Sequence, residues 1–172
     1  VLFHPVTTEF QSAESQMEEL LMAVKDIKMQ AVVLWPNVDA GADGVSQAIR
    51  RFREMNPDTD MHFYKNFEPE IYIPILNHAS CAVGNSSSFV RDASFLGTPI
   101  VLVGSRQDGR ERSESVIRVD PKKNDIGSAI RRQLEHGKYP SSDLYGKPGT
   151  SRMIAEKISH LKPYLQKKLV TN

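Results

Sequence analysis

Short apolar runs alternate along this chain with longer stretches in which apolar residues recur every three or four positions. Several of the short runs are nearly continuous in valine, isoleucine and leucine, which is typical of parallel strands buried on both faces. They cover residues 1–3, 31–35, 61–64, 81–83, 99–103 and 116–119. The pattern therefore predicts six strands separated by helices.

The longer stretches have helical spacing. Within 16–27, for example, Met17, Leu20, Leu21 and Val24 fall at i, i+3, i+4 and i+7, on one face of a helix. The other predicted helices are 44–55, 70–78, 89–95, 126–135, 151–161 and 163–169. Strands that alternate with helices imply βαβ units, so we predict an α/β fold with a doubly wound, Rossmann-like parallel sheet.

Length and terminal sequence bear on the domain organisation. The chain has 172 residues, which suits a single domain spanning 1–172. It opens on "VLFHP", inside an apolar run, whereas termini usually lie at the surface. We therefore expect a domain that belongs to a longer protein. Residues 141–150, rich in Ser, Gly and Pro, are the predicted loop before the last helices.

Charge and cysteine content exclude several classes of protein. The formal net charge is +1, so no strong field favours nucleic acid or a membrane surface, and we expect neither as a partner. Cys81 is the only cysteine, so there is no disulfide framework, and we expect a cytoplasmic protein. The five histidines show no metal-ligand spacing. We predict no metal and no cofactor.

The residues that follow the predicted strands are polar. In a doubly wound sheet, ligands bind beyond the carboxyl ends of the strands, so these residues are expected to line one rim. They include "HPVTT" after the first strand, "PNVDAG" after the second, "KNF" after the third, "GNSSS" after the fourth and "GSR" after the fifth. The rim is thus rich in His, Asn, Asp, Ser and Arg.

The "GNSSS" stretch lies between a strand and a helix. Gly84 allows a sharp turn and a close approach of the backbone to a ligand. Ser86 and Ser87 offer hydroxyl and N–H groups at the start of the helix, where an anion is favoured. Serine is also a preferred helix cap, so a phosphate site and a simple cap both remain open. A single glycine matches neither the P-loop nor the GxGxxG fingerprint.

Arg106 follows the fifth strand by three residues, and its guanidinium suits a phosphate. The loop that it opens, "RQDGRER", mixes arginines with Asp108 and Glu111. Arg110 and Arg112 are interpreted as members of a solvated loop that pairs its own charges. Only Arg106 is therefore retained as a candidate ligand-binding arginine.

Five further rim residues are candidates, each with an ordinary alternative. His4 ends the first strand and is either an acid, base or ligand group or a packed histidine. Asn37 and Asp39 either hold a sugar hydroxyl or form a turn. Phe67 either stacks on a base or belongs to the core. Asp92 either reaches a ribose or is a surface charge.

Five motifs in order resemble a known family. "HPVTT", "PNVDAG", "GNSS", "GTP" and "GSRQDGRE" look like the carboxy-terminal domain of the UDP-N-acetylglucosamine 2-epimerases. The closest likeness is to the hydrolysing branch, which makes N-acetylmannosamine and UDP for sialic-acid synthesis. The resemblance spans nearly the whole chain and implies the second half of a two-domain GT-B fold.

The resemblance also implies roles for the candidate residues. His4 would be the catalytic-site histidine that contacts the sugar nucleotide, and Asn37 would contact the substrate. Phe67 would lie beside the uracil, Ser86 and Ser87 would hold the diphosphate, and Arg106 would lie beside the nucleotide. The family's chemistry is anti elimination of UDP, proton removal at C2 and water addition to the glycal. Its main acid and base carboxylates belong to the amino-terminal domain, which is an expected partner together with a second copy of the protein.

Two positions depart from the family pattern. Asp92 stands where a glutamate usually grips the ribose, and Phe89 stands where a small residue is commoner. Two other functions therefore remain open: a non-hydrolysing epimerase that returns UDP-N-acetylmannosamine, and a nucleotide-binding module without catalysis. An NAD-dependent dehydrogenase is disfavoured, because the first strand leads into His-Pro-Val-Thr-Thr rather than a glycine-rich turn.

Overall fold

The computed structural model describes residues 1–37 and 40–162. A parallel sheet forms its centre, and the β-strands are β1 (Ala31–Leu34), β2 (Met61–Tyr64), β3 (Ala82–Gly84), β4 (Ile100–Val103) and β5 (Val116–Val119). The α-helices are α1 (Ala13–Ile27), α2 (Ala42–Met55), α3 (Pro69–His78), α4 (Ser94–Leu96), α5 (Lys123–His136) and α6 (Thr150–Ser159). A 3-10 helix, η1 (Thr7–Ser12), precedes α1, and a π-helix, η2 (Phe89–Ala93), leads into α4.

The amino-terminal segment occupies the middle of the sheet. Leu2 pairs in parallel with Leu34 of β1 on one side and with Gly84 of β3 on the other. The resulting order is β2–β1–residues 1–3–β3–β4–β5, with parallel pairing throughout. This is the order of a doubly wound Rossmann-type sheet. Successive strands are added on one side from residues 1–3 to β2 and on the other side from β3 to β5, so the switch point lies between residues 1–3 and β3.

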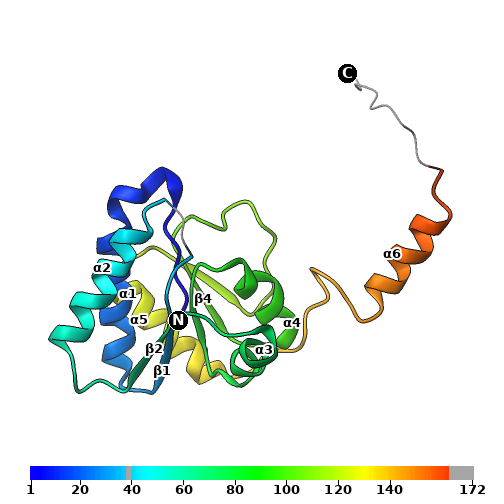
Figure 1. The fold of residues 1–172 in the computed structure, drawn as a ribbon. Helices are drawn as coiled ribbons and strands as arrows, with labels where there is room; N and C mark the ends of the chain where they lie inside the picture. The colour runs from blue at the N-terminus through cyan, green and yellow to red at the C-terminus, as the bar shows by residue number, and fades with distance from the viewer. Residues whose placement is uncertain (38–39, 163–172) are drawn as a thin grey trace.

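Alternate residues of the strands face two separate cores. Val83, Val101 and Val103 face α1, α2 and α5, whereas Ile100 and Leu102 face α3 and η2. Figure 1 shows α1, α2 and α5 on one side of the sheet and α3 and α4 on the other. Both faces of β3 and β4 are covered, which explains why these two runs are apolar throughout.

Most of the predicted elements are confirmed, with adjusted ends. Strands 61–64 and 116–119 have the predicted bounds, and the loop before α6 is present. Residues 1–3 make only single bridges on each side rather than a full strand. The predicted helix 89–95 is a π-helix followed by one α-helical turn. The predicted helix 163–169 lies outside the described residues.

Helix α6 projects away from the body of the protein (Figure 1). Its apolar residues Met153, Ile154 and Ile158 are all exposed. Within the described ranges, no helix combines the length and apolarity needed to cross a membrane.

Candidate functional site

The strand order brings three polar loops together at the carboxyl edge of the sheet. His4 follows the central segment, Asn85 and Ser86 follow β3, and Arg106 follows β4. These strands are neighbours, so their loops meet at the topological switch point of the sheet. Doubly wound folds bind ligands at this point. The predicted meeting of His4, Ser86 and Arg106 at one rim is thus consistent with the strand order.

Asn85 links these loops. Its side-chain Oδ1 accepts a hydrogen bond from the His4 N–H at 2.7 Å, and its Nδ2 donates to the His4 carbonyl at 2.8 Å. Its own carbonyl accepts from Gln107 Nε2 at 2.8 Å and from Arg106 Nη1 at 3.4 Å. Asn85 is fully buried, so each of these bonds satisfies a polar group that would otherwise be costly. Sequence reasoning did not single out Asn85 or Gln107.

His4 is buried, with 5% of its surface exposed. The Asn37 backbone N–H donates to its ring Nδ1 at 3.4 Å. A neutral imidazole whose Nδ1 accepts a hydrogen bond carries its proton on Nε2. The structure thus relates Asn37 to His4 through the backbone, and the Asn37 side chain is exposed at the rim.

Gly84 has a structural reason to be glycine. Its φ is 140°, and a Cβ at this position would overlap the carbonyl oxygen of Leu2 in the neighbouring central segment. The close approach that the structure shows is therefore between two strands of the sheet. Next to this approach, the Asn85 N–H donates to the Leu2 carbonyl at 3.1 Å.

The serines combine a cap with a hydroxyl network. The helix begins at Ser87, and Ser86 Oγ accepts from the Ser88 N–H at 3.3 Å, as a capping serine does. Ser86 Oγ also lies 2.9 Å from Ser88 Oγ, which lies 2.6 Å from the Tyr72 hydroxyl. Ser88 thus supports Ser86. The capping role and an anion site are compatible, because both use the start of this helix.

A π-helix follows the serines and contains Asp92. Single π-helical turns are rare and often occur at functional sites. Asp92 is half-buried, and this burial raises the pKa of its carboxyl, against a smaller lowering effect of Arg91. Phe89, in the same turn, is 2% exposed and packs in the core beneath α3. The large residue at this position is therefore accommodated inside the fold.

The loop after β4 is attached to the rest of the rim on two sides. Arg106 and Gln107 bond to Asn85, while Ser105 Oγ donates to Glu9 Oε1 of η1 at 2.5 Å. The hydrogen bond from Ser105, with another from Gln16, lowers the pKa of Glu9. Further along, Arg112 pairs with Asp108 at 3.1 Å, which confirms that this part of the loop pairs its own charges.

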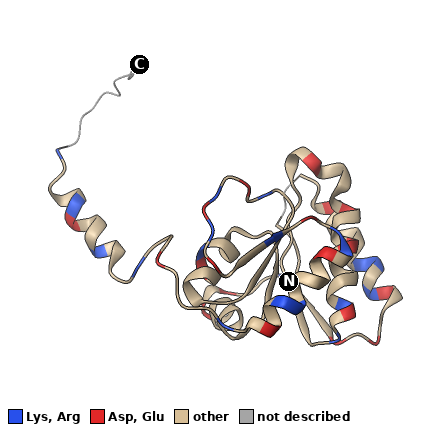
Figure 2. Cartoon of the chain, turned by 180° about the vertical axis from the view of Figure 1, so that it is seen from behind, with Lys and Arg blue, Asp and Glu red and all other residues tan. Residues whose placement is uncertain are grey.

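Two other candidates are less closely joined to the rim. Phe67 is half-buried, its ring lies 4.9 Å from that of Tyr64, and it lines an apolar cavity with Leu34 and Tyr72. A place beside a nucleotide base stays a prediction for this residue. Asp39 lies outside the described residues. Figure 2 shows acidic and basic residues interspersed over the helices.

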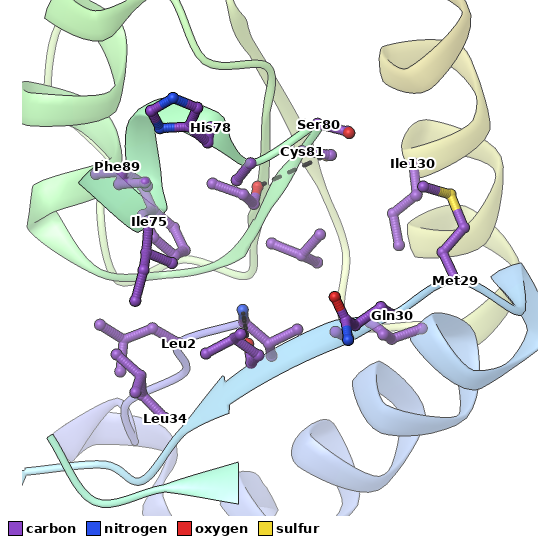
Figure 3. A pocket seen from close by; sticks show the side chains of 18 of the residues that line it. Leu2, Met29, Gln30, Leu34, Ile75, His78, Ser80, Cys81, Phe89 and Ile130 are labelled. Atoms are coloured by element: carbon purple, nitrogen blue, oxygen red, sulfur yellow. Dashed lines mark hydrogen bonds between the residues drawn. The ribbon is translucent and has the colours of Figure 1, made fainter. Parts of the chain in front are cut away.

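The apolar cavity, of about 480 Å³, extends to the opposite edge of the sheet. Figure 3 shows Leu2, Met29, Cys81 and Ile130 around it. Its lining is mostly apolar, and among the described residues no Lys or Arg lines it. Burial raises the pKa of the Cys81 thiol to about 12, which leaves this cysteine protonated and unreactive.

A doubly wound parallel sheet with polar loops gathered at its switch point defines a Rossmann-like α/β domain. The family model described as "UDP-N-acetylglucosamine 2-epimerase" matches residues 1–159. The chain therefore belongs to the UDP-N-acetylglucosamine 2-epimerase family, as its motifs predicted, and matches the carboxy-terminal part of its relatives.

Two curated relatives illustrate the match. A UDP-N-acetylglucosamine 2-epimerase of Neisseria meningitidis is 28% identical over 160 residues, covering 93% of this chain and 41% of the relative. A UDP-N,N'-diacetylbacillosamine 2-epimerase (hydrolyzing) of Legionella pneumophila is 31% identical over 151 residues, covering 88% and 39%. The chain thus spans about two fifths of the length of these relatives.

Solved structures confirm the fold. A structure of S. aureus MnaA with UDP has a TM-score of 0.68 at 15% identity, covering 92% of this chain and 44% of that one. A Neisseria meningitidis UDP-GlcNAc 2-epimerase bound to UDP-GlcNAc has a TM-score of 0.67 at 13% identity, covering 92% and 44%. The chain has the fold of the second half of a GT-B protein.

Proposed function

We propose that this chain is the UDP-binding domain of a hydrolysing UDP-N-acetylglucosamine 2-epimerase, which converts UDP-N-acetylglucosamine and water into N-acetylmannosamine and UDP. The observation that carries the proposal is the rim fixed by Asn85, which holds His4, the serine-led helix and Arg106 in one place. Relatives of Legionella pneumophila and Campylobacter jejuni that are named as hydrolyzing 2-epimerases support this branch.

Different residues of the rim would bind different parts of the ligand. The helix that starts at Ser87, with the Ser86 hydroxyl and the Arg106 guanidinium, provides donors for a diphosphate. His4 would donate from Nε2 to the sugar nucleotide. Asp92 would hold the ribose, with Asn37, Asp39 and Phe67 contacting the sugar or base. Asp92 by itself does not supply the pair of acid and base groups that epimerisation needs.

The domain organisation is part of the same proposal. Chain 1–172 would form one of two halves, and the other half would supply the catalytic carboxylates and close over the nucleotide. The relatives are more than twice as long as the match, which supports a second half. We expect chain 1–172 by itself to bind UDP weakly and to turn over no substrate.

Calorimetry with UDP tests the binding function. We expect binding in the high micromolar to millimolar range, weaker affinity for ADP, and loss of binding when Arg106 is replaced by glutamine. Absence of any heat with millimolar UDP, or equal affinity for ADP, would contradict the proposal. Because Arg112 pairs within its loop, Arg112→Gln is the matched control and should bind UDP normally.

The relatives also support a second candidate, the non-hydrolysing epimerase. The Neisseria relative has the unqualified name UDP-N-acetylglucosamine 2-epimerase. Product analysis of the complete enzyme separates the two: free N-acetylmannosamine indicates hydrolysis, whereas a UDP-sugar indicates simple epimerisation. If replacement of His4 in that enzyme left turnover unchanged, this domain would instead be a nucleotide-binding module that contributes no catalytic group.

A further inference from the structure

Three hydroxyl groups form a chain that leads from helix α3 to the rim. The Tyr72 hydroxyl lies 2.6 Å from Ser88 Oγ, and Ser88 Oγ lies 2.9 Å from Ser86 Oγ. Tyr72 comes from α3, which packs beside η2, and its ring lines the apolar cavity. The sequence motifs do not include Tyr72, so nothing in them connects it with the serines.

The hydrogen atoms of this chain have a preferred direction. Each hydroxyl carries one hydrogen, and a phenol is a stronger donor than an aliphatic alcohol because it is more acidic. Tyr72 therefore donates to Ser88, and Ser88 donates its own hydrogen to Ser86. Ser86 Oγ also accepts from the Ser88 N–H at 3.3 Å. With both acceptor positions used, the Ser86 hydrogen is left to point toward a ligand.

The surroundings of Tyr72 favour its role as a donor. Burial raises the pKa of Tyr72, and the negative charge of Asp92 adds to this effect. The phenol therefore keeps its proton over the whole neutral range. Hydrogen bonds in a chain polarise one another, so a donor at the far end strengthens the donor at the rim.

We propose that Tyr72 is a positioning residue for the anion site: through Ser88 it directs the Ser86 hydroxyl hydrogen toward the phosphate oxygens of a nucleoside diphosphate. This inference rests on the proposed function, because it assumes that the serines hold the diphosphate. It adds a residue outside the binding motifs. Tyr72 does not contact the ligand and would act only through the two serines.

Tyr72→Phe is the appropriate test because it removes only the hydroxyl and keeps the ring in the cavity. We expect about fivefold weaker binding of UDP by calorimetry, as for the loss of one hydrogen bond. Affinity for uridine, followed by ligand-observed NMR, should not change, since uridine has no phosphate. Ser88→Ala should weaken UDP to a similar extent, and the double variant should be no weaker than either one. Ser88→Thr, which keeps a hydroxyl, should restore binding.

Tyr139→Phe is the matched control. Its hydroxyl donates to Gln133 Oε1 at 2.8 Å and belongs to no rim contact, so this variant should bind UDP normally. If Tyr72→Phe binds UDP as the wild type does, or loses uridine affinity equally, the positioning role is wrong and the proposed function stands. If Tyr139→Phe is equally weak, the effect is general loosening and the role is again wrong. A wild-type chain that does not bind UDP overturns both proposals.

Discussion

The two edges of the sheet are built from the same strands but are chemically different. At the carboxyl edge, Asn85 and Gln107 are buried and fix three loops through hydrogen bonds. At the amino edge, Ala31 and Cys81 border an apolar cavity, and the thiol is held protonated. The amino edge also contains a buried amide, Gln133, but it bonds the carbonyls of Ile100 and Ser115 at the starts of two adjacent strands. Asn85 instead joins three loops to one another, and loops fixed in this way provide the defined geometry that a binding site needs.

The largest effect should come from Gly84→Ala. A Cβ there would overlap the Leu2 carbonyl, and the positive φ adds strain, so the central pairing of the sheet would have to move. We expect a loss of more than about 4 kcal/mol in the free energy of unfolding, measured with denaturant. Gly109→Ala is the control, because Gly109 also has positive φ, at 80°, but nothing lies within 4 Å of its Cβ position.

For Gly109→Ala we expect only about 1–2 kcal/mol, the cost of the backbone conformation alone. Equal losses in the two variants would show that the Leu2 contact is not what makes Gly84 necessary. In that case the carboxyl edge would be less tightly built than the structure indicates, and the contrast between the two edges would weaken.

The second prediction compares one asparagine at each edge. Asn85→Ala leaves the buried His4 N–H and carbonyl without partners, and we expect a loss of about 3 kcal/mol in stability and no measurable UDP binding. Asn56, at the end of α2, bonds Lys25 and the Phe52 carbonyl. Asn56→Ala should cost about 1 kcal/mol and leave UDP binding unchanged. Thermal unfolding and calorimetry on both variants provide the measurement.

Arg106 provides a smaller and more specific test of the rim. Arg106→Lys keeps the positive charge but loses the forked donors, so we expect roughly tenfold weaker UDP binding with little change in stability. Calorimetry at two salt concentrations measures this. Arg118→Lys is a control from the neighbouring strand, since Arg118 pairs with Asp120. An unchanged affinity in Arg106→Lys would mean that Arg106 supports the rim through Asn85 and does not bind the phosphates.

The sequence predicts much of the fold, because buried parallel strands and amphipathic helices have distinct apolar patterns. It also predicts which loops lie at the rim, since this follows from the chain direction of each strand. The role of Asn85 could not be predicted, because its bonds join residues 81 positions apart and depend on which strands are neighbours. Tyr72 was missed for a similar reason. It lies among apolar residues of α3, as a core residue does, and only the three-dimensional structure shows that its hydroxyl bonds Ser88.

The smallest effect should come from Asp92→Asn, and its sign is informative. Burial raises the pKa of this carboxyl in the folded state, so its charged form destabilises the fold above that pKa. Removing the charge should raise the midpoint of thermal unfolding slightly at pH 7, and the gain should shrink as the pH falls toward 4.

UDP binding should become about two- to threefold weaker if Asp92 holds the ribose. A gain in stability together with a loss of binding is typical of a residue kept for function. Asp108→Asn, which breaks an exposed pair with Arg112, should show no such gain. A stability gain without loss of UDP affinity would instead mean that Asp92 plays no part in binding.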